Sequence, residues 1–282
     1  AAGHVKKPGR ELLESGPFLM IDCIKIDAVA DLVEKYNIDT IYHLAAILSA
    51  RAEKNPKLAW DVNVNGLYNI LEVGRQCKCG VFTTSSIAAF GPNTPRDKTP
   101  QDTTQRPTTI YGVTKVTGEL LCNYYFRKYG VDARGVRFPG LISYKTPPGG
   151  GTTDYAVAIY FEAARHQKYT CYLKAGTFLD MMYMPDALRA AVELMEAAPS
   201  KLNHRNAFNV SAMTVAPETI AAEIKKIIPE FTFDYKIDPL RQAIADSWPN
   251  SLDDGAAREE WGWQPEYDLE SMSQDMIENI KK

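Results

Sequence analysis

The chain has 282 residues, a formal net charge of −3 at pH 7, 45% hydrophobic residues and 24% charged residues. This length is enough for one large domain, or for a domain with a smaller lobe. The small negative charge gives no reason to expect a nucleic acid or an anionic membrane as partner, and no apolar run reaches the roughly 18 residues of a membrane-spanning helix.

Short apolar runs typical of buried strands alternate with segments of helical periodicity along the first half of the chain. The expected strands are Phe18–Ile21, Thr40–Ala46, Gly80–Ser85 and Ala133–Phe138, and the expected helices are Asp27–Tyr36, Trp60–Cys77 and Tyr111–Tyr129. This alternation predicts an α/β fold of the Rossmann type, with a doubly wound parallel sheet. The segments after the strands, at 45–53, 85–92 and 139–153, should meet at the carboxyl edge of that sheet.

The pattern changes beyond about residue 150. Helical stretches at Tyr155–His166, Pro185–Ala197 and Ala216–Ile228 are separated by short strands and Pro-rich turns. We therefore expect a first domain over residues 1–150 and a smaller α/β lobe over residues 151–282, some of whose strands could complete the main sheet.

Tyr111 and Lys115 are four residues apart on a predicted helix, so they share one face. A tyrosine phenol ordinarily has a pKa of about 10 and is a poor base at neutral pH. A neighbouring ammonium favours the phenolate, which would let Tyr111 take a proton from a substrate hydroxyl. Most pairs at this spacing are only structural, so the surrounding sequence decides.

Ser86 directly follows a predicted strand and lies 25 residues before Tyr111. The stretch Thr84-Ser-Ser-Ile-Ala-Ala-Phe-Gly91 resembles the Ser-Ser-x-x-x-Tyr-Gly segment of extended short-chain dehydrogenases and sugar-nucleotide epimerases. The resemblance implies a catalytic trio of Tyr111, Lys115 and Ser86, in which the serine holds the substrate oxygen and the lysine also binds a cofactor ribose. Capping of the strand end is the alternative role for Ser85 and Ser86.

Other segments resemble the same family in the same order. Ile41-Tyr-His-Leu-Ala-Ala46 resembles the strand and turn beneath the cofactor, and Arg137-Phe-Pro-Gly140 resembles the turn at the nicotinamide. Asp22-Cys23 resembles the pair that contacts adenine. Asp61-Val-Asn-Val-Asn-Gly66 resembles the helix segment whose first asparagine, here Asn63, braces the central strands. The resemblance implies that NAD is bound by Asp22, Cys23, Leu44, Ala45, Ala46, Asn63, Ser85, Tyr111, Lys115 and Pro139.

Three narrower stretches are Gly149-Gly-Gly-Thr-Thr-Asp-Tyr-Ala156, Met181-Met-Tyr-Met184 and Asp238–Pro249. They resemble the short-chain type of L-threonine 3-dehydrogenase, an oxidoreductase of threonine catabolism that converts L-threonine to 2-amino-3-oxobutanoate with NAD⁺. The resemblance implies a homodimer formed through the helices Trp60–Cys77 and Tyr111–Tyr129. It also implies that the glycine loop closes over a small substrate, and that L-threonine is bound by Ser49, Ser86, Tyr111 and Thr152.

Two alternatives remain, a sugar-nucleotide epimerase or dehydratase with the same trio, and a non-catalytic protein with this fold. A nucleotide sugar needs a basic pocket for its diphosphate, whereas residues 151–282 are not notably basic. The four histidines are scattered, so we expect no metal site. Five cysteines without paired spacing favour a reducing compartment, so we expect bacterial cytoplasm or a eukaryotic mitochondrial matrix rather than secretion.

The sequence lacks the Gly-x-x-Gly-x-x-Gly loop that usually cradles a dinucleotide pyrophosphate. Gly3, Gly9 and Gly16 are not spaced for it, and we expect no strand before them. Either the chain is part of a longer protein with about 40 more N-terminal residues, or it is a natural form that no longer binds NAD. We favour the first explanation because the trio is intact, and we expect the chain as given to bind NAD weakly.

Overall fold

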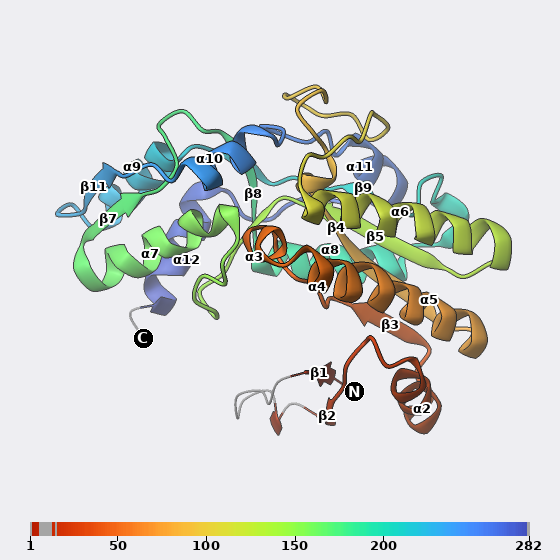
Figure 1. Cartoon of the computed structure of the whole chain (residues 1–282). Coiled ribbons are helices and arrows are strands. Elements are labelled where there is room, and N and C mark those ends of the chain that lie inside the picture. Colours follow the sequence, from red (N-terminus) through yellow and green to blue (C-terminus); the bar gives the residue numbers. More distant parts are fainter. Residues whose placement is uncertain (1, 6–12, 15, 281–282) are drawn as a thin grey trace.

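The computed structural model describes residues 2–5, 13–14 and 16–280 (Figure 1), so Gly9 lies outside the described residues. At its centre four parallel strands lie in the order β3–β4–β5–β9, which are Thr40–His43, Gly80–Ser86, Ala133–Phe138 and Phe208–Asn209. The strand β9 comes from the second half of the chain, so this half contributes directly to the main sheet.

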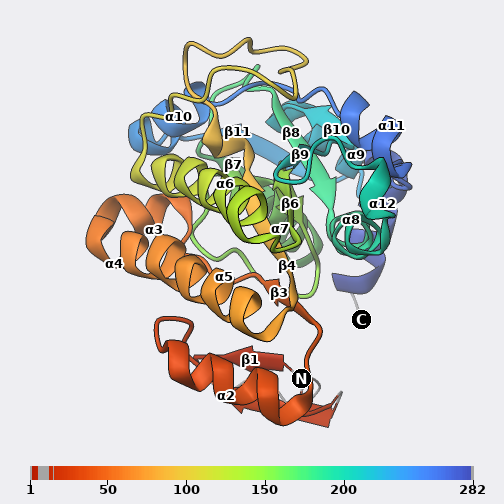
Figure 2. The ribbon, with the colours of Figure 1, turned by 90° about the vertical axis from the view of Figure 1, so that its right-hand side faces the viewer.

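Side chains alternate across β4, which explains why helices cover both faces of the sheet. Val81 packs in a core with α5 (Gly66–Cys77) and α6 (Ile110–Tyr129), whereas Phe82 packs in another core with α8 (Met184–Glu196). Figure 2 shows α5 and α6 on one side of the sheet and α8 on the other. The predicted doubly wound α/β fold is therefore confirmed.

The chain after residue 150 builds a lobe beside the sheet, around a large apolar core (Figure 1). One of its sheets contains β8 (Leu179–Tyr183) and β10 (Met213–Val215) together with β6 (Gly140–Ile142), which comes before residue 150, and the other contains β7 (Lys168–Cys171) and β11 (Thr232–Tyr235). Its helical elements are η3 (Thr152–Asp154), α7 (Tyr155–His166), α9 (Pro217–Ile227), α10 (Pro239–Asp246) and α12 (Leu269–Ile280). The short helices η4 (Pro199–Lys201), which follows α8, and α11 (Gly255–Trp261), which packs against β9, lie with the main sheet instead. Among the described residues, no helix combines the length and apolarity needed to cross a bilayer.

The expected helix Trp60–Cys77 is more complex in the structure. Helical backbone starts earlier, at α4 (Pro56–Trp60), passes through the π-helical turn η1 (Asp61–Asn65) and continues as α5. A further short helix, α3 (Ser49–Lys54), is absent from the sequence-based prediction. Both differences lie beside the expected site, where π-helical turns often occur.

The expectation that no strand precedes the N-terminal glycines is wrong for Gly16, because a strand that contains Gly3 precedes it. The strand β1 (Ala2–His4) pairs in parallel with β2 (Phe18–Met20), ahead of α2 (Ile26–Tyr36). The two strands form a sheet of their own, separate from β3. A strand of three residues is too short to show an apolar period in the sequence, so β1 is recognised by its pairing with β2 and not by its composition.

Candidate active site

The predicted trio meets where β4 ends and α6 begins. Lys115 Nζ lies 5.4 Å from the centroid of the Tyr111 ring, and the Tyr111 phenol shares a hydrogen bond with the Ser86 side chain. The Ser86 hydroxyl oxygen also accepts the Ala88 N–H at 3.2 Å. Capping of the turn after β4 and contact with the phenol are therefore both roles of this serine.

A glycine allows α6 to begin so close to β4. A Cβ on Gly112 would lie 2.3 Å from the Ala88 carbonyl oxygen, so a larger residue would push the helix away. The helix start is also fixed by Thr109, whose hydroxyl oxygen accepts the Gly112 N–H at 3.1 Å. From α3, Glu53 accepts the Ile110 N–H at 2.8 Å. These contacts hold the first turn of α6, which carries Tyr111.

Burial sets the ionisation of the pair. It raises the pKa of Tyr111 to about 12, although the hydrogen bond with Ser86 acts to lower this pKa. It lowers the pKa of Lys115 to about 8, against the negative charge of Glu119. Lys115 is therefore mainly protonated at neutral pH, and its Nζ donates to the Thr84 carbonyl oxygen at 2.6 Å. Such an ammonium beside the phenol favours the phenolate.

A polar cavity lies behind Lys115, between β3, β4 and the helices α5 and α6. Burial, and next the charge of Lys115, lower the pKa of His43 to about 4, so this imidazole is neutral at neutral pH. Asn206 also lines the cavity, and both of its side-chain polar atoms are buried without a partner in the described part of the chain. The cavity is therefore polar, and Glu119 is the only acidic residue among the described residues that line it.

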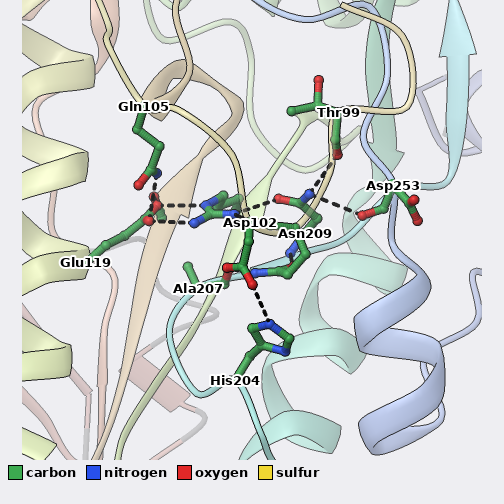
Figure 3. Close-up of polar contacts among 11 residues, drawn as sticks. Thr99, Asp102, Gln105, Glu119, His204, Ala207, Asn209 and Asp253 are labelled. Carbon is green, nitrogen blue, oxygen red and sulfur yellow. Dashed lines mark hydrogen bonds and ion pairs between the residues drawn. The ribbon is translucent and has the colours of Figure 1, made fainter. Parts of the chain in front are cut away.

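Glu119 belongs to a buried polar network to which we assigned no role from the sequence (Figure 3). Arg137 Nε and Nη2 donate to its two carboxylate oxygens at 3.0 Å and 2.8 Å, and Gln105 Nε2 donates at 2.8 Å. The Ser85 hydroxyl donates to the same carboxylate, so this side chain points into the interior. The local signal is spacing, because Glu119 follows Lys115 by one more helical turn.

Asn63 braces the turn after β3 from the π-helical turn η1. Its Oδ1 accepts the Ile47 N–H at 2.7 Å, and its Nδ2 donates to the Ile47 carbonyl oxygen at 3.2 Å. The same Nδ2 donates to Thr114 Oγ1 at 3.1 Å, next to Lys115 on α6. Asn63 thus joins the end of β3 to the helix that carries the catalytic pair.

The other predicted cofactor residues lie at three places. Asp22 and Cys23 form the turn before α2, where the Cys23 carbonyl oxygen accepts Asn69 Nδ2 of α5 at 3.1 Å. Leu44 and Ala45 are exposed directly after β3, with Ala46 half-buried beside them, whereas Pro139 is buried between β5 and β6.

Ser49 and Thr152 come from different lobes and meet side by side. Their hydroxyl oxygens lie 3.4 Å apart, and both side chains are buried. The glycine loop before Thr152 is held by Asp154, which accepts the N–H groups of Gly150 and Gly151 at 2.6 Å and 2.8 Å. Gly150 has a φ of +102°, a conformation that favours glycine. The loop therefore has a defined shape around Thr152.

A model of the NAD dependent epimerase/dehydratase family matches residues 3–211. The chain belongs to this family. It is 55% identical over 282 residues to an uncharacterized epimerase/dehydratase of Staphylococcus haemolyticus (strain JCSC1435), covering 100% of this chain and 89% of that protein. The X-ray structure of L-threonine dehydrogenase from Clostridium difficile is similar with a TM-score of 0.97 and 56% identity, covering 99% of this chain and 88% of that one. A monomeric L-threonine 3-dehydrogenase from a metagenome gives a TM-score of 0.95 and 45% identity, covering 99% and 89%.

NAD is the cofactor of this epimerase/dehydratase family member. The residues present fit a dinucleotide, because exposed Leu44 and the small Ala45 leave the backbone after β3 accessible, and Lys115 supplies a buried ammonium donor. Within the described residues, no three His, Cys, Asp or Glu side chains gather as metal ligands.

Proposed function

We propose that this protein is an NAD-dependent L-threonine 3-dehydrogenase, which oxidises L-threonine to 2-amino-3-oxobutanoate. The observation that carries the proposal is the 56% identity, over 99% of this chain, to a solved L-threonine dehydrogenase. The meeting of Ser86, Tyr111 and Lys115 supports it, because oxidation of an alcohol needs a base beside the reacting hydroxyl.

In this proposal the Ser86 side chain hydrogen-bonds the β-hydroxyl of L-threonine, and the Tyr111 phenolate takes the hydroxyl proton. The Lys115 ammonium stabilises that phenolate, which burial alone disfavours by raising the pKa of Tyr111 to about 12. When bound, NAD⁺ would supply the acceptor for the hydride that leaves the β-carbon. Loss of the hydroxyl proton to Tyr111 and of the hydride from the β-carbon would convert the alcohol to a ketone, which balances the oxidation.

Ser49 and Thr152 are proposed to hold the polar end of the amino acid. Both carry hydroxyls, which can accept from an ammonium and donate to a carboxylate. They are buried and lie 3.4 Å apart at the meeting of the two lobes, as a small zwitterionic substrate requires. Lys115, Leu44, Ala45 and Ala46 would contact NAD, with Asp22 and Cys23 at its adenine end.

The proposal is tested with the full-length protein by following NADH formation with L-threonine, L-serine or UDP-glucose as substrate. We expect L-threonine to be oxidised, and we expect Tyr111→Phe to lower kcat at least about 100-fold. Tyr129→Phe is the matched control, because Tyr129 ends the same helix and is 44% exposed. Turnover of UDP-glucose without oxidation of L-threonine would instead indicate a sugar-nucleotide enzyme.

We also infer that two copies pair through α5 and α6. On α6, Leu120 is 62% exposed and Tyr124 is 47% exposed, and on α5 Tyr68 is 47% exposed. By contrast, Tyr125 is buried against the sheet and Leu121 packs on the same core. Large apolar side chains gathered on neighbouring helices favour contact with another protein surface.

A further inference from the structure

Glu119 and Arg137 form a buried ion pair that the proposed proton transfer does not use. We propose that Glu119 is a positioning residue, which keeps Lys115 protonated and fixes the Ser86 end of β4 against α6. The inference rests on the proposed function, because oxidation of the alcohol needs an ammonium at Lys115 beside the Tyr111 phenol.

Tyr111, Lys115 and Glu119 follow one another at intervals of four residues on α6, so they lie along one helix face. The opposite charges of Lys115 and Glu119 are therefore one turn apart in the interior, where the two residues are 9% and 4% exposed. Charges interact more strongly in such a buried place than in water. A carboxylate here favours the charged form of the lysine.

The same carboxylate joins the segments that carry the site. It accepts from Ser85, which precedes Ser86 at the end of β4, and from Arg137 near the end of β5. It also accepts from Gln105, which belongs to the loop that leads into α6. Movement of Glu119 would therefore change the position of Ser86 relative to α6.

The other groups that face Lys115 provide no negative charge. Tyr111 is on the same helix, and burial raises its pKa, so it is neutral in the resting protein. From β3, His43 is neutral because burial and the charge of Lys115 lower its pKa to about 4. Thr84 from β4 and Asn63 from η1 are uncharged. Arg137, beyond Glu119, offsets part of the carboxylate charge, so a test must vary both members of the pair.

The test compares the wild type with Glu119→Gln, which keeps the side-chain size and an oxygen to accept from Ser85 but removes the charge. Glu223→Gln is the matched control, because Glu223 is 8% exposed and lies on α9 in the other lobe. The pH dependence of kcat/KM for L-threonine is measured together with an NMR titration of ε-¹³C-labelled lysine. The Lys115 signal is assigned by its absence in Lys115→Arg.

We expect Glu119→Gln to move the alkaline limb of kcat/KM, and the titration midpoint of Lys115, down by on the order of one pH unit. Glu223→Gln should leave both unchanged. A folded Glu119→Gln protein that titrates as the wild type does overturns the inference. The NMR titration needs no turnover. A wild type that does not oxidise L-threonine would therefore refute the proposed function, whereas the titration of Lys115 alone would still decide this inference.

Removal of one partner leaves Arg137 as a buried, unpaired charge, which could prevent folding. The double variant Glu119→Gln/Arg137→Gln removes both charges and should show a shift in the same direction, because Glu119 is the charge that acts on Lys115. A folded double variant without a shift overturns the inference. The inference is also overturned if Glu119→Gln and the double variant both fail to fold while Glu119→Asp folds and its Lys115 titrates as in the wild type, because the role of the ion pair would then be structural.

Discussion

Asn63 offers a quantitative test of how the end of β3 is held to α6. Asn63→Ala removes three hydrogen bonds, two to the backbone of Ile47 at 2.7 Å and 3.2 Å and one to Thr114 at 3.1 Å. The Ile47 groups are only partly buried, so water can replace some of this bonding, whereas Thr114 retains its own bond to the Tyr111 carbonyl oxygen. At about 1 kcal/mol for each bond, and more for a group left unsatisfied, we expect a loss of about 2–4 kcal/mol of stability.

This loss corresponds to a fall in Tm of roughly 5–12 °C for a protein of this size. Thermal unfolding followed by circular dichroism measures it, and Asn65→Ala is the matched control. Asn65 lies in the same π-helical turn, but its one side-chain bond, to Asp61 at 3.1 Å, is exposed. Equal Tm values for the two variants would refute the bracing role of Asn63.

Three further predictions concern charge and assembly. Lys115→Met should abolish oxidation but stabilise the fold by about 1–2 kcal/mol at neutral pH, because burial lowers the pKa of this lysine from 10.5 to about 8. The gain in stability should shrink above pH 8, as the wild-type lysine loses its proton. A variant that is less stable than the wild type at neutral pH would contradict this prediction. Burial opposes a positive charge on His204, but hydrogen bonds, of which the one to Glu260 is the strongest, outweigh burial and raise the pKa of His204. The stability that the protonated His204 contributes is therefore complete below its pKa in the unfolded chain and is lost as the pH rises through its pKa in the folded protein. The Tm difference between the wild type and His204→Gln should be larger at pH 6 than at pH 9, and a constant difference would exclude this linkage. Leu120→Lys should convert a dimer to a monomer, as measured by light scattering. Leu188→Lys is the control and should leave the dimer intact, because Leu188 is 59% exposed but lies on α8. A wild type that is already monomeric refutes the proposed pairing.

The fold could be predicted because its signals are local. The helix Tyr155–His166 has the expected bounds, and α6 begins one residue before the expected Tyr111. The π-helical turn η1 could not be predicted, because such a turn depends on the contacts that Asn63 makes rather than on helix propensity. The meeting of Ser49 with Thr152 likewise depends on how the lobes pack, and only the family resemblance indicated it.

The buried ion pair of Glu119 and Arg137 could not be predicted from the sequence. Charged residues are usually exposed, so neither Glu119 nor Arg137 stands out in composition or periodicity. A buried arginine is also not sufficient, because Arg134 is 2% exposed and has a different set of partners, the carboxylate of Asp132 and the carbonyl oxygens at the end of α8. What separates the two arginines is the acidic partner one turn beyond Lys115 on α6. An acidic residue that continues a Tyr-x-x-x-Lys stripe by four more residues is therefore the local pattern from which such a pair could be inferred in other chains of this family.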